Sequence, residues 1–522
     1  MRPRRKRESI PEARHDVFRE HLIARFAESA SHHRIPDVLT HFRNRSPGPP
    51  KRGTPPLHSV AVLAAVLISM LGCSPAPDSA KGPESLVQDT LYYLDNSTAR
   101  RELVTEEQRA YLHEKFLRLY YSPWRRDLPV TNRSDIEAEI HGFRKNPGYG
   151  ENRRRHTAAW VPELERNMDL KTYPNASFKA IATVNTDLRV LPTLKPHFNG
   201  LKDTSRSYPF DNLQNSAIHA NSPLFVTHVA ADRSWLLVES SSGHGWAPAR
   251  DVARVDDDFI QIWAHSDQVA IIKDPTPVYL ADGTFVFKVG LGAQFPGRIE
   301  NETHCRILVA MPDERMRAVI HEALVPRGAA IAKPLPLTAE NIARLAAELL
   351  NKPYGWGGIY HNRDCSSTLK DLFAPFDLWL PRHSSQQALE GGAFVRLRGL
   401  TDEAKEAAIV RTGVPFATLL WAKGHIMLYI GSLQKQAVVF HNTWGIKTLD
   451  AQGKKGRKII GKTVIGSLHP GAGLPNADLT KGDLITRIEG MTFLLPGSAP
   501  PGSPAASAPG GNGMQTSGNG IQ

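Results

Sequence analysis

Cys365 and the residues around it have the types and spacing of a catalytic nucleophile. Leu369 and Leu372 follow it at helical spacing, which predicts a helix with Asp364 as its N-cap and the cysteine in its first turn. A thiol at the positive end of a helix dipole is expected to have a lowered pKa, and therefore more of the nucleophilic thiolate. Because a lone cysteine is more often a small buried hydrophobic residue, this interpretation depends on partners.

Two histidines further along the chain supply those partners. His425 begins a predicted strand over 424–431, and His441 lies on the next predicted strand, over 438–442. A thiol on a helix, an imidazole on one strand and a polar group on the adjacent strand form the layout of a nucleophile, its general base and a residue that orients the base. With 21 histidines in the chain, one near a cysteine arises easily by chance, but two on consecutive strands do not.

The composition of the chain restricts the class of protein. A length of 522 residues predicts several domains, and 41% hydrophobic with 22% charged residues excludes wholesale disorder and a polytopic membrane protein. Three widely spaced cysteines fit neither a disulfide scaffold nor a zinc motif. Residues 1–56 carry +7 of the total net charge of +12, so the basicity does not indicate nucleic-acid binding. The sequence has no phosphate-binding loop and no metal-ligand cluster, so we expect no metal and no cofactor.

The N-terminal segment 1–73 has the features of an export signal. A basic stretch ending at Arg52 precedes an apolar run over 60–71, which is too short to span a bilayer comfortably and typical of a secretory signal. The sequence MLGC at 70–73 resembles a bacterial lipobox, which predicts that Cys73 is lipidated and that 74–90 forms a polar linker. A plain cleaved signal and a cysteine buried in an apolar helix are the alternatives.

Hydrophobic periodicity divides the rest of the chain into further parts. Residues 91–180 are predicted to be mainly helical, with a helix over 106–121 whose apolar stripe contains Tyr111, Phe116, Leu119 and Tyr120. Residues 181–256 and 257–332 contain short β-type runs between turns, which favours two small barrels. Residues 333–495 combine a helix capped by Thr338 with a strand-rich region, and 496–522 is rich in Gly, Pro and Ser and predicted to be disordered.

Five separated motifs in the C-terminal part occur in the order found in a known enzyme family. They are YGWGG at 354–358, DCS at 364–366, LPRHSSQQ at 380–387, GH at 424–425 and the later His441. On these motifs, the segment from roughly 335 to 470 resembles the NlpC/p60 family of papain-like peptidoglycan peptidases. Segments 189–193, 209–216 and 245–246 resemble the first SH3-like module of the family's multidomain Gram-negative members. Two departures are His383, where threonine is usual, and Ser367, where glycine is frequent.

This resemblance implies a fold class and a reaction. The fold would be multidomain, with a mainly helical N-terminal stabilising domain, two small SH3-like β-barrels and an α+β papain-like catalytic domain. The reaction would be hydrolysis of the γ-D-glutamyl–diamino acid bond (diaminopimelate or Lys) of peptidoglycan stem peptides. Cys365 would attack the carbonyl, His425 would act as base and then acid, and His441 would orient the His425 ring. The backbone amide of Cys365 and the Tyr354 hydroxyl are the candidate oxyanion donors.

The resemblance also implies a site for the free amino end of L-Ala. It assigns the ammonium to Asp364, Ser366 and Ser384, and we count Trp356 and Arg382 among the substrate-binding residues. Plain helix capping is the simpler role for Asp364, and one carboxylate can fulfil both. The expected partners are stem peptides and, through the lipid, a membrane, with no nucleic acid. The expected location is the periplasmic side of a bacterial envelope, and the expected state is a monomer.

Two other functions remain open from the sequence. A related papain-like amidase would cut the muramoyl–L-Ala bond, but the third residue in that group is more often Asn, Asp or Glu than a histidine such as His441. A wall-binding lipoprotein with a degenerate peptidase domain is the non-enzymatic alternative, and the intact Cys365 and His425 argue against it. The first SH3-like module would either bind the wall or border the active-site cleft.

Overall fold

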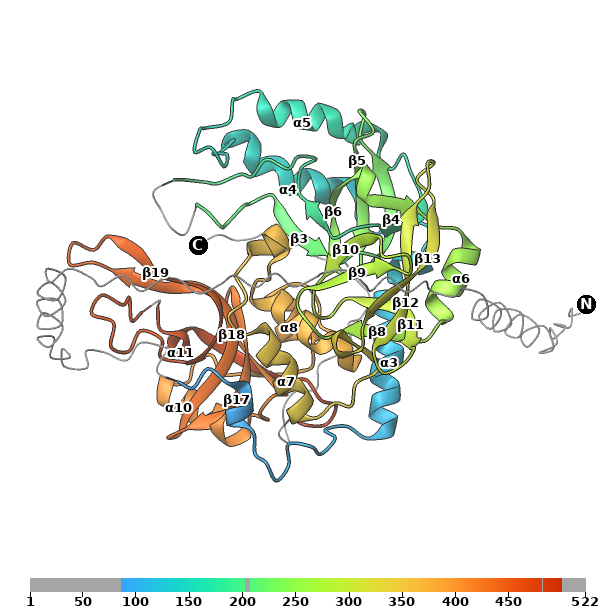
Figure 1. The fold of residues 1–522 in the computed structure, drawn as a ribbon. Helices are drawn as coiled ribbons and strands as arrows, with labels where there is room; N and C mark the ends of the chain where they lie inside the picture. Colours follow the sequence, from blue (N-terminus) through green and yellow to red (C-terminus); the bar gives the residue numbers. More distant parts are fainter. Residues whose placement is uncertain (1–85, 202–206, 481, 500–522) are drawn as a thin grey trace, which may run out of the picture. The chain divides into compact units, whose positions relative to one another are not determined.

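The computed structural model describes residues 86–201, 207–480 and 482–499. The predicted leader, the lipidation candidate Cys73 and nearly all of the predicted C-terminal tail lie outside these residues. Helices, two β domains and a mixed domain follow one another along the described chain, from blue through green to red in Figure 1. None of the described helices combines the length and apolarity that crossing a bilayer requires.

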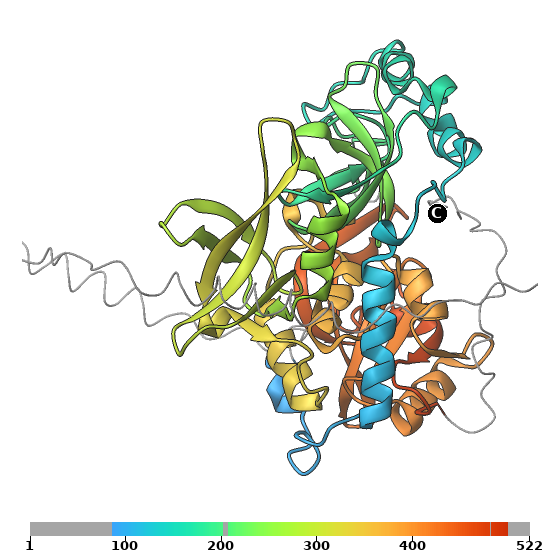
Figure 2. The same ribbon diagram turned by 90° about the vertical axis from the view of Figure 1, so that its right-hand side faces the viewer.

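The N-terminal part is helical, as predicted, and its longest helix buries Phe116 of the predicted stripe but exposes Tyr111. Thr105 caps this helix in a capping box, and the buried residues are Leu112 and Phe116, whereas Tyr111 of the predicted stripe is 56% exposed. The prediction for Tyr111 was wrong because the helix packs through Phe116, whose ring lies 5.6 Å from that of Trp379. Figure 2 shows this helix, in light blue, running along the orange C-terminal domain. The elements of this part are η3 (Thr90–Tyr93), α3 (Glu106–Tyr120), η4 (Ser122–Arg125), α4 (Arg133–Lys145), α5 (Trp160–Met168) and η5 (Leu170–Thr172).

The first β domain is a seven-stranded antiparallel sheet in the order β3-β2-β6-β5-β4-β1-β7. Its strands are β1 (Phe178–Ala182), β2 (Thr186–Arg189), β3 (Gln214–Ile218), β4 (Pro223–Val229), β5 (Trp235–Ser240), β6 (Gly243–Pro248) and β7 (Val252–Arg254), with η6 (Ala249–Asp251) before β7. Buried Arg189 bonds the Asp211 carboxylate at 2.7 Å and the Gln214 side chain at 2.6 Å. This network holds the end of the long β2–β3 connection and the start of β3 in place.

The second β domain repeats the seven-stranded arrangement, in the order β10-β9-β13-β12-β11-β8-β14. It opens with a helix that the sequence did not predict, α6 (Asp257–His265), whose N-cap is Asp256. Its strands are β8 (Gln268–Ile271), β9 (Thr276–Leu280), β10 (Phe285–Val289), β11 (Gln294–Ile299), β12 (His304–Pro312), β13 (Ala318–Pro326) and β14 (Ala330–Ala332), with η7 (Arg327–Ala329) before β14. Cys305 lies in the core of this domain, unpaired and fully buried.

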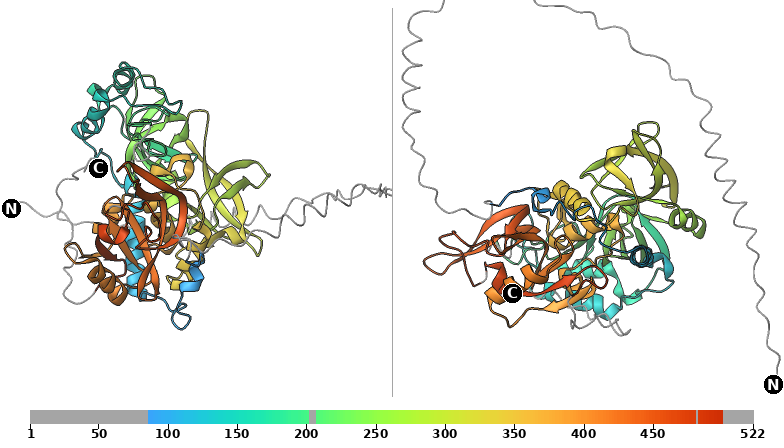
Figure 3. Two further views of the ribbon diagram at one scale, coloured as in Figure 1. Left: turned by 90° about the vertical axis from the view of Figure 1, so that its left-hand side faces the viewer. Right: turned by 90° about the horizontal axis from the view of Figure 1, so that it is seen from below.

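The C-terminal domain packs helices on a six-stranded antiparallel sheet in the order β15-β20-β16-β17-β18-β19. Its helices are α7 (Ala339–Leu349), η8 (Trp356–His361), α8 (Cys365–Phe373), η9 (Ala374–Phe376), α9 (Ser384–Glu390), α10 (Asp402–Thr412) and α11 (Leu484–Arg487). Its strands are β15 (Ala393–Arg396), β16 (Thr418–Ala422), β17 (His425–Leu433), β18 (Gln436–Leu449), β19 (Lys455–Ser467) and β20 (Ile488–Phe493). The β18–β19 hairpin, red in Figures 1 and 3, extends beyond the other strands of the sheet. The predicted multidomain fold class is confirmed.

Candidate active site

The predicted helix that carries Cys365 is present as α8, with the predicted cap. The Asp364 carboxylate accepts the Ser367 backbone N–H at 2.9 Å, and the Ser367 hydroxyl accepts the Asp364 N–H at 2.9 Å, which completes a capping box. Cys365 is the first residue of α8 and is 8% exposed. α8 packs against β17 and β18, so the thiol is held at the junction of a helix end and two strands (Figure 1).

The glycine-rich segment before α8 allows the first β domain to approach closely. Gly357 and Gly358 have φ of +60° and +91°, which side-chain-bearing residues rarely adopt. A Cβ on Gly357 would lie 2.5 Å from the carbonyl oxygen of Gln214, and one on Gly358 would lie 2.6 Å from the Cβ of Ala217. Since both contacts are with β3, the glycines are required for β3 to border the segment that leads into Cys365.

The two predicted histidines meet each other directly. His425 begins β17, His441 lies on the neighbouring β18, and the Nε2 of His425 lies 2.8 Å from the Nδ1 of His441. If His425 donates through Nε2, its Nδ1 is free to accept a proton from a thiol, and His441 carries its own proton on Nε2. The backbone of Ile426, next to His425, hydrogen-bonds the sulfur of Cys365, which places the thiol at the start of β17.

Burial, not the helix dipole, dominates the ionisation of these groups. Burial raises the pKa of Cys365 to about 12, with a further increase from the Asp364 carboxylate, so the expectation of a lowered thiol pKa was wrong. Burial also lowers the pKa of His441 to about 4, and burial together with His441 and Arg487 lowers the pKa of His425 well below its usual value. The resting site therefore holds a neutral thiol beside two neutral imidazoles, and the thiol proton must leave as the substrate is attacked.

The raised thiol pKa predicts how alkylation of Cys365 depends on pH. In the folded protein we expect the rate of iodoacetamide modification to keep rising, by about tenfold per pH unit, through the range above about pH 8.5 where an ordinary cysteine levels off. Mass spectrometry of the peptide that contains Cys365 measures the rate. The same peptide in urea-unfolded protein is the control and should level off near the ordinary value. A plateau below pH 7 in the folded protein would show a resting thiolate instead.

A buried ion pair lies next to the thiol and joins three parts of the site. Arg382 donates to both carboxylate oxygens of Asp364, at 2.8 and 3.1 Å, and to the hydroxyl of Ser366 at 3.0 Å. Its Nε donates to the hydroxyl of Ser216 on β3 at 2.8 Å. Despite burial, Arg382 and the capping hydrogen bonds hold the pKa of Asp364 below its usual value. The Asp364 carboxylate thus already has a cationic partner and a capping role.

The other predicted site residues occupy three places around this pair. Tyr354 is buried, and burial, together with the nearby Asp364 carboxylate, raises the pKa of its hydroxyl well above the usual value. Trp356 contacts Phe210 of the first β domain, with ring centroids 5.2 Å apart. Ser384 is the first residue of α9 and is partly buried, and its hydroxyl makes none of the side-chain hydrogen bonds found among the described residues.

Three residues that hold the site together were not predicted from the sequence. Ser216 bonds Arg382, and the motif 209–216 was noted only as a mark of the β module. Gln387 donates to the Ser366 and Pro381 carbonyls, both at 2.8 Å, and ties α9 to α8. Asn442 donates to the Arg363 carbonyl at 2.8 Å, from the position after His441. Within the described ranges, no group of three or more His, Cys, Asp or Glu side chains has a metal-binding arrangement.

Replacing His441 tests whether it orients His425. We expect His441→Ala to lower kcat by about 100-fold and leave KM within about twofold, because the His425 ring loses the acceptor that fixes its tautomer. His441→Asn is the matched control, since its carbonyl oxygen can still accept that proton and should retain more activity. Steady-state kinetics with a soluble peptide substrate measures both. Equal kcat for the Ala and Asn variants would mean that His441 has no orienting role.

Four family models match successive parts of the chain. They are the N-terminal NlpC/P60 stabilising domain over 60–173, the SH3 domain of SH3b1 type over 196–248, the SH3 domain of SH3b2 type over 256–300, and the NlpC/P60 family over 351–463. The last match contains the cysteine and both histidines of the site. The C-terminal part of the chain is an NlpC/P60 domain.

Solved structures of the NlpC/P60 family extend this likeness. An NlpC/P60 endopeptidase from Photobacterium damselae subsp. piscicida is 25% identical, with a TM-score of 0.69 over 78% of this chain and 97% of the other. An NlpC/P60 family protein from Bacillus cereus ATCC 10987 is 15% identical, with a TM-score of 0.41 over 61% of this chain and 100% of the other. No curated protein matches the sequence. The family-model matches identify the two β domains as SH3-like.

Proposed function

We propose that the protein is a cysteine peptidase that hydrolyses the γ-D-glutamyl–diamino acid bond of peptidoglycan stem peptides. The observation that carries the proposal is the 2.8 Å contact between His425 and His441 beside a thiol at the N-terminus of α8. Thiol, base and orienting group are the parts that thioester chemistry on an amide requires. The match of the NlpC/P60 model over these residues supports the same reaction class.

The reaction would proceed through a thioester. The Cys365 sulfur bonds to the γ-carbonyl carbon of D-Glu while its proton passes to the Nδ1 of His425. The C–N bond then breaks, and His425 returns the proton to the leaving amine. Water, deprotonated by His425, hydrolyses the thioester and restores the thiol. The Cys365 backbone N–H and the buried Tyr354 hydroxyl are the proposed donors to the oxyanion.

The proposed substrate has a free N-terminal L-Ala. Its ammonium would lie near Asp364, Ser366 and Ser384, and it would share the Asp364 carboxylate with Arg382. A buried ammonium without an acceptor would be costly, so a blocked amine or a lost carboxylate should weaken binding. The border that β3 forms along the site supports a role for the first SH3-like domain in limiting which peptides enter. The proposed role in the cell is wall turnover or recycling.

Peptide cleavage separates this proposal from its alternatives. The protein would be incubated separately with L-Ala-γ-D-Glu-diaminopimelate, its N-acetylated form, its Lys analogue and muramoyl-tripeptide. Mass spectrometry would identify the fragments released from each. We expect release of L-Ala-D-Glu from the free tripeptide and much slower cleavage of the N-acetylated one. Release of intact tripeptide from the muramoyl compound would identify an amidase instead. Binding without any cleavage would identify a wall-binding protein.

We also propose that the protein is an exported lipoprotein anchored through Cys73 on the periplasmic side of the envelope. The apolar run over 60–71 and the lipobox-like residues after it support this proposal. In cells fed labelled palmitate, the protein should acquire label, and Cys73→Ala should not. Label that survives this substitution would contradict the anchor.

A further inference from the structure

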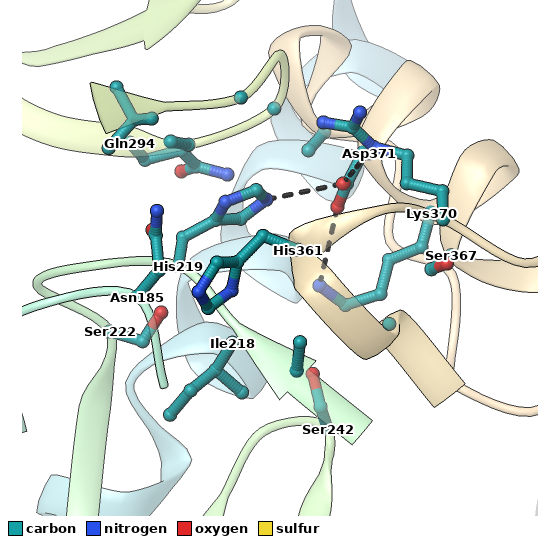
Figure 4. A pocket seen from close by; sticks show the side chains of 18 of the residues that line it. Asn185, Ile218, His219, Ser222, Ser242, Gln294, His361, Ser367, Lys370 and Asp371 are labelled. Carbon is teal, nitrogen blue, oxygen red and sulfur yellow. Dashed lines mark hydrogen bonds and ion pairs between the residues drawn. The ribbon is translucent and has the colours of Figure 1, made fainter. Parts of the chain in front are cut away.

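A cavity of about 490 Å³ lies apart from the thiol, where α3, both SH3-like domains and the NlpC/P60 domain meet. Its size is typical of small-molecule sites. The first SH3-like domain contributes His219 and Ser242, the second contributes Lys288 and Gln294, and α8 contributes Lys370 among others. Figure 4 shows labelled side chains from both SH3-like domains and from the NlpC/P60 domain around one space, among them His219, Gln294 and Lys370.

The cavity lies on the far side of the helix that carries the nucleophile. With 3.6 residues per turn, Ser367, Lys370 and Asp371 lie on the side of α8 opposite to Cys365. These three residues line the cavity, whereas Cys365, His425 and His441 do not. The cavity is thus a separate space that shares one helix with the active site.

Close approach of the second SH3-like domain builds one wall of the cavity. Gly292, at φ +90°, has no room for a side chain, because a Cβ there would lie 2.6 Å from the backbone oxygen of Asp371. A Cβ on Gly290 would lie 2.5 Å from the guanidinium of Arg363. The loop that contains Gly290 and Gly292 therefore packs closely against Arg363 and the last turn of α8, and it forms one wall of the cavity.

Positive charge exceeds negative charge in the lining. The lining contains two carboxylates, Asp274 and Asp371, and five Lys or Arg side chains: Lys288, Lys352, Arg363, Lys370 and Arg382. Arg382 is paired with Asp364 outside the cavity, and Arg363 bonds both Asp274 and Asp371. The lining thus has three further positive charges, those of its lysines, whereas its two carboxylates are already partly neutralised by Arg363. An uncompensated cation in a partly enclosed space favours an anionic ligand.

The donors that face the cavity still have hydrogen-bonding capacity. The Asp371 carboxylate pairs with the Arg363 guanidinium at 2.6 Å and with the Nε2 of His219 at 3.2 Å. The ammonium of Lys370 lies 3.9 Å from the same carboxylate, which is a long contact. Burial lowers the pKa of Lys370, and an anion beside it would offset that cost. Gln294 accepts the Lys333 ammonium on its carboxamide oxygen at 2.5 Å, which leaves its NH₂ group to donate.

We propose that this cavity binds a small molecule carrying one or two carboxylates. Lys370 would bind the first carboxylate, with His361 and the Ser242 hydroxyl beside it, and Lys288 at the rim would meet a second. A carboxylate suits the lining better than a phosphate, because a phosphate would place up to two negative charges on one group close to Asp274 and Asp371, whereas each carboxylate carries only one. Since α8 spans both sites, the ligand would stabilise the helix that positions Cys365. This inference goes beyond the proposed peptidase activity and does not depend on it.

Calorimetric titration of the full chain with glutarate tests the inference. Glutarate should bind with one-to-one stoichiometry, and glutaramide, its uncharged analogue, should not. Lys370→Met keeps the length of the side chain without its charge and should weaken binding at least tenfold. Lys455→Met, which removes an exposed lysine of the same domain, is the matched control and should bind like the wild type.

A second variant guards against a folding defect at Lys370. Ser242→Leu narrows the cavity from the first SH3-like domain without touching α8, and it should also weaken glutarate binding. Inorganic phosphate is the competing probe. Equal affinity for glutarate and glutaramide, tighter binding of phosphate, or unchanged binding in both cavity variants would overturn the proposal. None of these outcomes bears on peptide cleavage, which is measured separately.

Discussion

Cys365→Ala should abolish cleavage of stem peptides, with turnover reduced by at least about 10⁴-fold and the fold unchanged. Among the described residues the other thiol is that of Cys305, which lies fully buried in the core of the second SH3-like domain and cannot replace Cys365. In enzymes that act through a covalent intermediate, loss of the nucleophile costs nearly as much as loss of the whole catalytic group. The side chain at 365 packs beside Leu369 and Leu372, so alanine removes only one buried atom from the core.

Cys305→Ala is the matched control for this prediction. It also removes a buried thiol, but at a distance from His425, and it should retain wild-type turnover at a small cost in stability. Both variants would be assayed by mass spectrometry of released peptides and compared by circular dichroism. Turnover by Cys365→Ala within tenfold of wild type would remove the nucleophile assignment, even with the His425–His441 contact intact.

Arg382→Met should be the most destabilising single change near the site, by about 3–5 kcal/mol. Arg382 is 4% exposed and bonds Asp364, Ser366 and Ser216, so its loss leaves the Asp364 carboxylate buried with no cationic partner. The sign of the Asp364 shift gives the pH dependence. Its pKa is lowered in the folded state, so the pair stabilises the protein above the ordinary aspartate pKa and loses that contribution as the pH falls through the folded value.

Two further variants separate the ion pair from loss of packing. Arg382→Met combined with Asp364→Asn removes both charges, keeps an N-cap residue, and should recover part of the lost stability. Arg396→Met removes an exposed arginine from the same domain and should change stability by no more than about 0.5 kcal/mol. Urea unfolding followed by tryptophan fluorescence measures all three. A loss below 1 kcal/mol for Arg382→Met would show that Asp364 finds another partner.

Local patterns predicted the catalytic helix correctly because its signals act over a few residues. Asp364 caps α8, and Thr338 caps α7, because an N-cap bond reaches only two or three residues along the chain. The strands over 424–431 and 438–442 that carry His425 and His441 were predicted, and they are present and pair as adjacent antiparallel strands. The two strands are consecutive in the sequence, so they were predicted to be adjacent and to bring both histidines to one site, and the order of the other strands in the sheet was not predicted.

The pKa of a side chain, its burial and its hydrogen-bond partners depend on residues distant in the sequence, and these properties were predicted wrongly or not at all. The helix dipole is a local feature and suggested a lowered thiol pKa, but burial of Cys365 beside Asp364 raises it. Tyr111 fits the helical stripe of α3 by spacing, yet it faces outward, because the partner of α3 is Trp379, more than 250 residues away in sequence. Ser216 could not be assigned for the same reason, since its partner Arg382 belongs to another domain.

The amino-acid order alone determined where helices begin, which strands carry the two imidazoles, and which residues have the chemistry of a thiol peptidase. Those features arise from hydrogen bonds and apolar spacing within one or two turns. Only the tertiary structure decided the ionisation of the thiol, the pairing of Asp364 with Arg382, and the cavity behind α8. Each of these depends on charges, desolvation and close glycine contacts between domains, which bring together residues that the sequence keeps far apart.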